Sequence, residues 1–149
     1  MALSRKRPRT LCEVARRVKN DEQKFDTAVL EFLDSFYAYP ELRSSAITDR
    51  PELIDALRDA YLSAVAEHLA RLYGLPIPEW TELQGNDLHR PFFAGGLESL
   101  KGVLVAESPT AFRRRLLFVS KDALSRPRLP PADEDAAANL TTPRGQQEL

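Results

Sequence analysis

An amphipathic pattern in the middle of the chain limits the possible folds more than any other feature. Apolar residues recur there with a period of about 3.6, at Leu53, Ile54, Leu57, Tyr61, Ala64, Val65, Leu69, Leu72 and Tyr73. Asp49 and Glu52 have the spacing of a capping box, and Pro51 is tolerated in a first helical turn. Gly74 suits the left-handed position that follows many helices. The pattern predicts a helix that begins after Asp49, ends before Gly74 and forms the spine of a domain.

Two shorter patterns of the same kind precede this predicted spine helix. Thr10 is expected to N-cap a helix that runs to about Lys19, with an apolar stripe of Leu11, Val14, Ala15 and Val18. Asp26 is expected to N-cap a second helix, whose stripe consists of Val29, Phe32, Leu33 and Phe36. Pro40 closes that segment, because proline cannot continue a helix.

Residues 75–96 are predicted to form a long ordered loop. Three prolines prevent regular helix there, yet the segment carries Trp80, Phe92 and Phe93. A structureless loop of this length is uncommon unless it is functional or well packed. We therefore expect its aromatic residues to pin the loop over the helices, with Trp80 buried against the spine helix.

Two further helices are expected after the loop. The fourth contains Leu97, Leu100, Val103 and Leu104 and ends before Ser108. The fifth begins with Ser108 as N-cap and Pro109 in the first turn. Residues 117–119 either extend this helix or form a short extended segment. The predicted fold is an all-α, single-domain bundle of about five helices with one long ordered, aromatic-containing loop.

The ends of the chain are predicted to be disordered, since a length of 149 residues fits one domain with tails. Residues 1–9 are polar and basic and read as a disordered arm, and residues 10–126 hold the helical domain. Residues 127–149 combine prolines, an acidic cluster and few large apolar groups, which is typical of a disordered tail.

The reactive residues predict no catalytic or metal site and no cofactor, so the chain is not expected to be an enzyme. Cys12 is the only cysteine, and His68 and His89 are isolated from it and from each other. A lone thiol forms no intramolecular disulfide, and two separated histidines form no metal cluster. No apolar run approaches the roughly 20 residues that cross a bilayer, and no secretory signal follows the basic start. We expect a cytoplasmic protein.

Charge is distributed unevenly along the chain. The first 20 residues carry seven basic side chains against Glu13, whereas the whole chain has a net charge of −1. A basic segment of this kind is a solvated tail, an arm that binds nucleic acid, or an arm that docks on an acidic surface. The candidate nucleic-acid-binding residues are Arg5, Lys6, Arg7, Arg9, Arg16 and Arg17.

A second candidate surface combines aromatic and arginine residues. Phe92 and Phe93 are close in sequence to Arg113, Arg114 and Arg115. Protein interfaces favour aromatic residues and arginine, so these five residues are the predicted partner-binding site. The competing interpretation is structural: the phenylalanines fill the core, and the arginines pair with an internal carboxylate such as Glu107.

Several segments resemble a family of small, uncharacterised bacterial helical proteins. The resemblance includes a helix followed by Gly-Leu-Pro and Pro-x-Trp, and it covers residues 69–81, 90–93, 97–101, 107–115 and 118–120. Members of that family are often encoded beside nucleotidyltransferase-like proteins, in arrangements similar to toxin–antitoxin pairs. The resemblance implies a non-enzymatic, antitoxin-like partner that masks or regulates a neighbouring protein. The alternative function is a DNA-binding regulator that uses the basic N-terminal segment.

Overall fold

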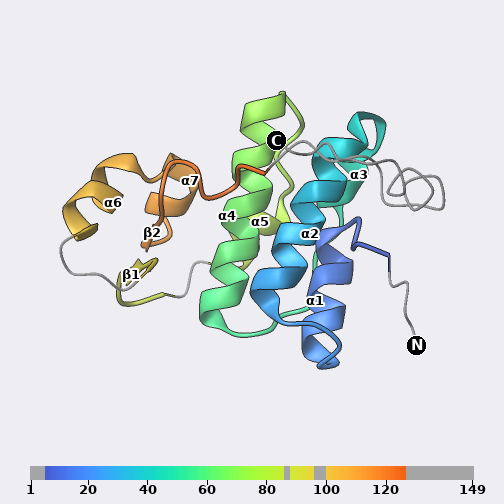
Figure 1. Ribbon diagram of the computed structural model, residues 1–149, viewed down its shortest axis with the longest axis horizontal. Helices are drawn as coiled ribbons and strands as arrows, with labels where there is room; N and C mark the ends of the chain where they lie inside the picture. Colours follow the sequence, from blue (N-terminus) through green and yellow to red (C-terminus); the bar gives the residue numbers. More distant parts are fainter. Residues whose placement is uncertain (1–5, 86–87, 96–99, 127–149) are drawn as a thin grey trace, which may run out of the picture.

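The computed structural model describes residues 6–85, 88–95 and 100–126. The first five residues and the tail predicted over residues 127–149 lie outside the described residues. Over the described ranges the chain is mainly helical, as predicted (Figure 1). It is not the all-α bundle of five helices that the sequence predicted, because the described residues form seven α-helices, the 3-10 helix η1 (Pro40–Leu42) and a small parallel sheet of two strands.

Helix α4 (Ala56–Tyr73) is the centre of the fold. The N-terminal helices lie on one side of it, and the elements from β1 onward lie on the other (Figure 1). Its middle is buried on several faces and is rich in small residues, which lets neighbouring elements approach closely: Ala60, Leu62, Ser63, Ala64, Val65, Ala66, Leu69 and Ala70. The predicted spine helix therefore exists, but it is covered from more than one direction.

The beginning of α4 differs from the prediction. Asp55, not Asp49, is the N-cap, and its side chain accepts a hydrogen bond from the Arg58 backbone N–H. In return, the Ile54 N–H donates to Asp59 Oδ1 at 2.7 Å. The capping box predicted from Asp49 and Glu52 is wrong, because the helix begins further along the chain, where Asp55 and Asp59 bond the free backbone N–H groups at its start. The end of α4 is as predicted, since Gly74 has a φ of 67°.

Helices α1 (Leu11–Lys19) and α2 (Phe25–Ala38) pack against each other beside α4 (Figure 1). The predicted cap of α1 is confirmed, because the Thr10 hydroxyl accepts a hydrogen bond from the Glu13 N–H. The predicted cap of α2 is wrong: the helix begins at Phe25, and Asp26 lies in its first turn. The sequence reading also missed the 3-10 helix η1 (Pro40–Leu42) and α3 (Arg43–Thr48).

The segment predicted as a long loop contains regular structure. Helix α5 (Trp80–Leu83) packs against α4, and β1 (Phe92–Phe93) belongs to the sheet. Trp80 is only 4% exposed, and its indole N–H donates to the Ile47 carbonyl at 3.1 Å, so its predicted burial is confirmed. Gly85 closes the turn after α5 with a φ of 80°. A Cβ there would lie 2.3 Å from the Ser63 hydroxyl, so this position requires glycine.

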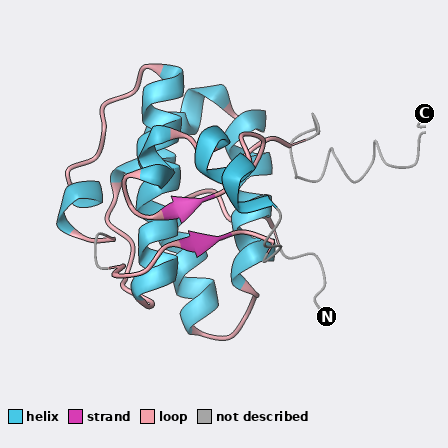
Figure 2. Ribbon diagram, turned by 90° about the vertical axis from the view of Figure 1, so that its left-hand side faces the viewer, coloured by secondary structure: helices cyan, strands magenta, loops and turns pink. Residues whose placement is uncertain are grey.

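The elements after β1 form a separate layer on α4. They are α6 (Lys101–Glu107), α7 (Thr110–Arg113) and β2 (Leu117–Phe118). Figure 2 shows the strands running parallel, with Phe92 paired with Leu117 and Phe93 with Phe118. Residues 117 and 118 are thus extended rather than helical. Ser108 is not the N-cap of α7, because its hydroxyl bonds to the Leu104 carbonyl and to Val119 instead.

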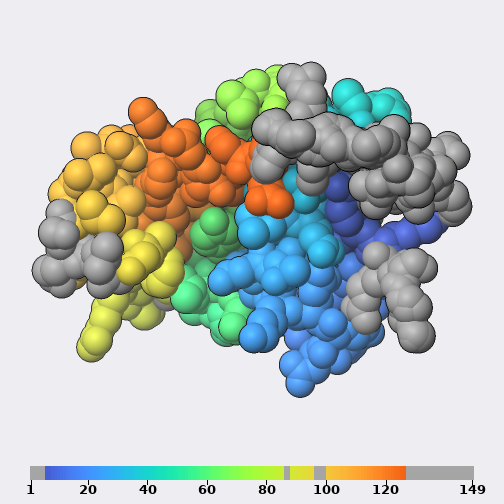
Figure 3. All heavy atoms as spheres, in the orientation of Figure 1, coloured from blue at the N-terminus to red at the C-terminus, as the bar shows by residue number. Residues whose placement is uncertain are grey.

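Residues 6–9, the described part of the predicted N-terminal arm, contact the helical domain. Pro8 is buried, and the Lys6 carbonyl accepts a hydrogen bond from Arg17 at 2.7 Å. The Arg9 guanidinium lies 4.3 Å from the centre of the Tyr39 ring. At the other end of the described chain, Arg126 makes two hydrogen bonds to Asp34. Both ends of the described chain therefore contact the N-terminal helices, and in Figure 3 the orange-red atoms lie against the lighter blue atoms of α2.

Candidate binding groove

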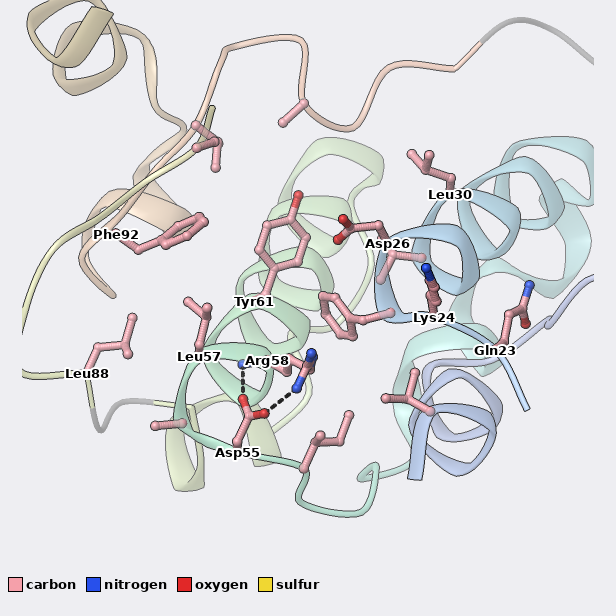
Figure 4. A pocket seen from close by; sticks show the side chains of 18 of the residues that line it. Gln23, Lys24, Asp26, Leu30, Asp55, Leu57, Arg58, Tyr61, Leu88 and Phe92 are labelled. Atoms are coloured by element: carbon pink, nitrogen blue, oxygen red, sulfur yellow. Dashed lines mark hydrogen bonds and ion pairs between the residues drawn. The ribbon is translucent and has the colours of Figure 1, made fainter. Parts of the chain in front are cut away.

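An open groove with a cavity volume of about 1700 Å³ crosses the start of α4. Three parts of the chain line it: the turn and first residues of α2, the start of α4, and the segments that flank the sheet. Its lining is mostly apolar, with Phe25, Val29, Leu30, Ile54, Leu57, Tyr61, Leu88, Phe92, Val119 and Ala123 (Figure 4). Leu30 and Leu57 are 38% and 36% exposed. These two leucines are the more exposed large apolar side chains of the lining, and another molecule could cover them.

Tyr61 is the central aromatic residue of the groove (Figure 4). Its ring packs edge to face against Phe25 on one side and Phe112 on the other, with centroid distances of 5.7 and 5.2 Å. Tyr61 therefore joins the two halves of the fold at the floor of the groove. Burial, and after it the nearby Asp26 carboxylate, raise the pKa of Tyr61 to about 12, so its hydroxyl stays neutral at physiological pH.

The charged residues of the groove are mainly acidic. Four carboxylates and two basic side chains line it, which leaves a net charge of −2: Asp21, Glu22, Asp26 and Asp55 against Lys24 and Arg58. Arg58 is paired with Asp55 at 2.5 Å. Asp26 makes no hydrogen bond or ion pair with any part of the chain that the structure describes, and it points toward the Tyr61 ring (Figure 4). The groove thus combines an apolar floor with an available carboxylate.

A buried ionic cluster lies on another face of α4. The Glu67 side chain is fully buried, and its carboxylate accepts hydrogen bonds from Arg115 at 2.6 Å, Arg114 at 3.0 Å and Arg71 at 2.8 Å. Burial alone raises the pKa of Glu67, but the hydrogen bonds from these arginines outweigh it and lower the pKa to about 2. Glu67 is therefore ionised, and the cluster joins α7 to α4.

The structure separates the five residues of the predicted partner-binding site. Phe92 lines the groove, whereas Phe93 stacks on Phe118 at 5.0 Å. Arg115 is buried in the Glu67 cluster and also donates to the Thr81 carbonyl. Arg114 is partly exposed and pairs with Glu67, and Arg113 donates to the Val105 carbonyl. The sequence predicted an internal carboxylate such as Glu107 as the partner of these arginines. In the described contacts that partner is Glu67, whereas Glu107 accepts a hydrogen bond from the Lys121 N–H.

Most described basic residues of the N-terminal segment make hydrogen bonds or ion pairs within the protein. Arg17 is buried and donates to Glu13 at 2.8 Å, and Arg9 donates to the Tyr39 hydroxyl. Arg7 lies 4.0 Å from Asp34, and Arg16 is 3.7 Å from Glu22. Lys6 is exposed, and Arg5 lies outside the described residues. Internal carboxylates and a tyrosine thus engage most of the arginines proposed to bind nucleic acid.

Two of the remaining reactive residues, Cys12 and His68, are partly buried. The Cys12 thiol donates to the Asp49 carbonyl, and burial raises its pKa. His68 is partly buried beside the Phe112 ring, and burial lowers its pKa. His89 is exposed. In the described ranges, no group of three or more His, Cys, Asp or Glu residues could hold a metal ion. No helix within those ranges is both long and apolar enough to cross a membrane.

No family model, no curated protein and no solved structure matches the chain.

Sequence reasoning missed the groove although it identified several of its residues. Leu57 and Tyr61 belong to the apolar stripe of the predicted spine helix, and Phe92 belongs to the predicted partner-binding site. Nothing in the sequence indicated that Asp26, predicted only as a helix cap, would face Tyr61. One sequence feature could have indicated the groove. It is the stripe of large apolar residues at the start of α4, which the other elements of a small domain do not fully cover.

Proposed function

We propose that this chain is a non-enzymatic protein-binding partner, antitoxin-like in that it masks or regulates a neighbouring protein, and that the groove is its binding surface. The observation that carries the proposal is the size and lining of the groove. Its volume of about 1700 Å³ exceeds the range of about 300–1,000 Å³ that is usual for small-molecule pockets. A segment of a protein fits such a groove better than a metabolite does.

The composition of the groove supports the same function. Aromatic residues are enriched in protein interfaces, and Phe25, Tyr61 and Phe92 all contribute to the lining. An amphipathic helix that lays its apolar face into such a groove is a recurring mode of recognition. Leu30 and Leu57 would contact the partner directly, because both side chains are partly exposed in the free chain and a bound partner would bury them.

The resemblance to proteins encoded beside nucleotidyltransferase-like proteins supplies the first partner to test. The test is co-expression of the full chain, tagged, with the protein encoded next to it, followed by purification at equal expression levels. Leu57→Glu introduces a charge into the groove at a partly exposed position, so it is expected to abolish retention of the partner and to leave the melting temperature close to that of the wild type.

Leu72→Glu is the matched control. Leu72 lies on the same helix, is 60% exposed and does not line the groove. This variant should retain the partner as the wild type does. If Leu57→Glu also retains it, or if the wild type retains none, the groove does not bind the neighbouring protein and the proposal is wrong.

The DNA-binding alternative has less support. Arg17 and Arg9, two of its candidate residues, are engaged by Glu13 and Tyr39. A DNA-binding surface needs several cations that reach phosphates along one face. No specific observation on the described residues favours that function over protein binding.

A further inference from the structure

The groove also indicates the chemistry of the segment that it binds. Resting on the protein-binding function proposed above, we propose that the groove takes an amphipathic helix of a partner, with the apolar stripe on the groove floor and a lysine or arginine paired with Asp26 beside Tyr61. Three features carry this inference: the shape of the groove, the position of Asp26 and the charge balance of the lining.

The shape fits a helical segment. An α-helix with its side chains has a diameter of about 10–12 Å and rises about 1.5 Å per residue, so about 1700 Å³ accommodates roughly 10–14 residues. Apolar side chains stand along both walls, with Leu30 on α2 and Leu88 and Phe92 on the opposite side (Figure 4). Leucines spaced at i, i+3, i+4 and i+7 on the partner would meet both walls.

Asp26 supplies the polar contact. It is exposed, it lies in the first turn of α2, and it makes no ion pair with the neighbouring Lys24 or with any other described residue. Its carboxylate lies beside the Tyr61 side chain in the middle of the groove (Figure 4). A lysine or arginine placed there would form a charge-assisted hydrogen bond with this carboxylate.

The charge balance of the lining favours a basic partner segment over an acidic one. The lining residues carry a net charge of −2, and although Glu22 is paired with Arg16 and Asp55 with Arg58, Asp26 is left for a cation of the partner. The chain's own residues 127–149 contain Asp133, Glu134, Asp135 and Glu148 against Arg128 and Arg144, so they carry the wrong charge to occupy the groove. A separate basic segment is the occupant that the lining favours.

The experiment uses the full chain and three labelled peptides of about 14 residues, the length that the groove holds. All three carry the same leucine stripe, and their flanking positions hold lysine, glutamine or glutamate. Fluorescence anisotropy measures binding at about 0.05 M and about 0.3 M salt, which differ in screening length. The lysine peptide should bind tightest, and its advantage over the glutamine peptide should shrink at the higher salt concentration.

Asp26→Asn should weaken binding of the lysine peptide by about fivefold, near the upper limit for one partly exposed ion pair, and leave the glutamine peptide unchanged. Glu41→Gln is the matched control, because Glu41 is an exposed carboxylate on η1, beyond the other end of α2. It should change neither affinity. Melting curves of both variants should overlay that of the wild type.

The inference is overturned if the three peptides bind equally, if none binds, or if Asp26→Asn leaves the preference for lysine intact. It is also overturned if the lysine peptide binds Leu57→Glu as well as it binds the wild type, because the apolar floor would then not be used. These failures differ from failure of the proposed function. If the neighbouring protein is still lost with Leu57→Glu while the peptides show no charge preference, the groove binds protein but does not select a basic helix.

Discussion

Replacing Glu67 by glutamine tests the buried ionic cluster most directly. Glutamine has nearly the same size, so the substitution removes a charge without opening a cavity. Arg71 and Arg114 are partly exposed and can turn toward water, but Arg115 is enclosed and its Nε already lacks a partner in the described structure. Removing one member of a buried ion pair costs about 3–5 kcal/mol, because the other charge remains desolvated. That is a large part of an ordinary folding free energy of about 5–15 kcal/mol.

Thermal and denaturant unfolding measure this loss. At about 2–4 °C per kcal/mol for a chain of this size, the melting temperature of Glu67→Gln should fall by roughly 6–20 °C. Glu82→Gln is the control, because Glu82 also pairs with Arg114 but is 58% exposed. It should cost less than about 1 kcal/mol. A Glu67→Gln protein within about 1 kcal/mol of the wild type would refute the argument that the carboxylate compensates Arg115.

The same cluster predicts a pH dependence. The pKa of Glu67 is about 2 in the folded chain, against an ordinary value of 4.5. Because folding lowers this pKa, the stabilisation is complete above pH 4.5 and is lost as the pH falls toward 2. The difference in unfolding free energy between the wild type and Glu67→Gln should therefore be constant above pH 4.5 and shrink below it. A difference that stays constant down to pH 2 would contradict the assigned charge state.

Other substitutions test separate parts of the fold. Trp80→Ala should cost about 3–5 kcal/mol, as expected for a core aromatic residue, and the wild-type fluorescence should be that of a buried indole. Gly85→Ala should lower the melting temperature, because its Cβ would meet Ser63 and the backbone of Asp59. Arg115→Glu should abolish cooperative unfolding, since it places a second carboxylate beside Glu67. A chain that ends at Arg128 should still melt cooperatively, because the deleted residues lack an apolar pattern.

Local capping signals predicted some helix ends and not others. Thr10 and Gly74 were assigned correctly because each acts on its own few neighbours: a hydroxyl accepts from Glu13 N–H, and a glycine adopts positive φ. The start of α4 was wrong because Asp49 and Asp55 are both acceptable caps by type. The choice between them depends on Asp59, which accepts from Ile54 N–H once the helix exists.

The ionic cluster shows a different limit of sequence reasoning. Three successive arginines indicated internal pairing or a partner contact, and the sequence offered Glu107 as the nearest carboxylate. The observed partner, Glu67, is 48 residues away from Arg115 along the chain. Its helical position faces α7 only because α7 packs across the middle of α4, which no local pattern encodes.

The groove exists because α4 is longer than the stretch that the neighbouring elements cover. Helix α7 covers α4 where Phe112 reaches Tyr61 and His68, but Leu57, one turn before Tyr61, stays partly exposed. The sequence could not reveal this, since a covered and an uncovered leucine have the same place in a helical stripe. Leaving large apolar residues in contact with water forgoes the stabilisation that burial gives, about 25 cal/mol per Å². A partner that fills the groove would recover that stabilisation, which is the physical reason to look for the function at this end of α4.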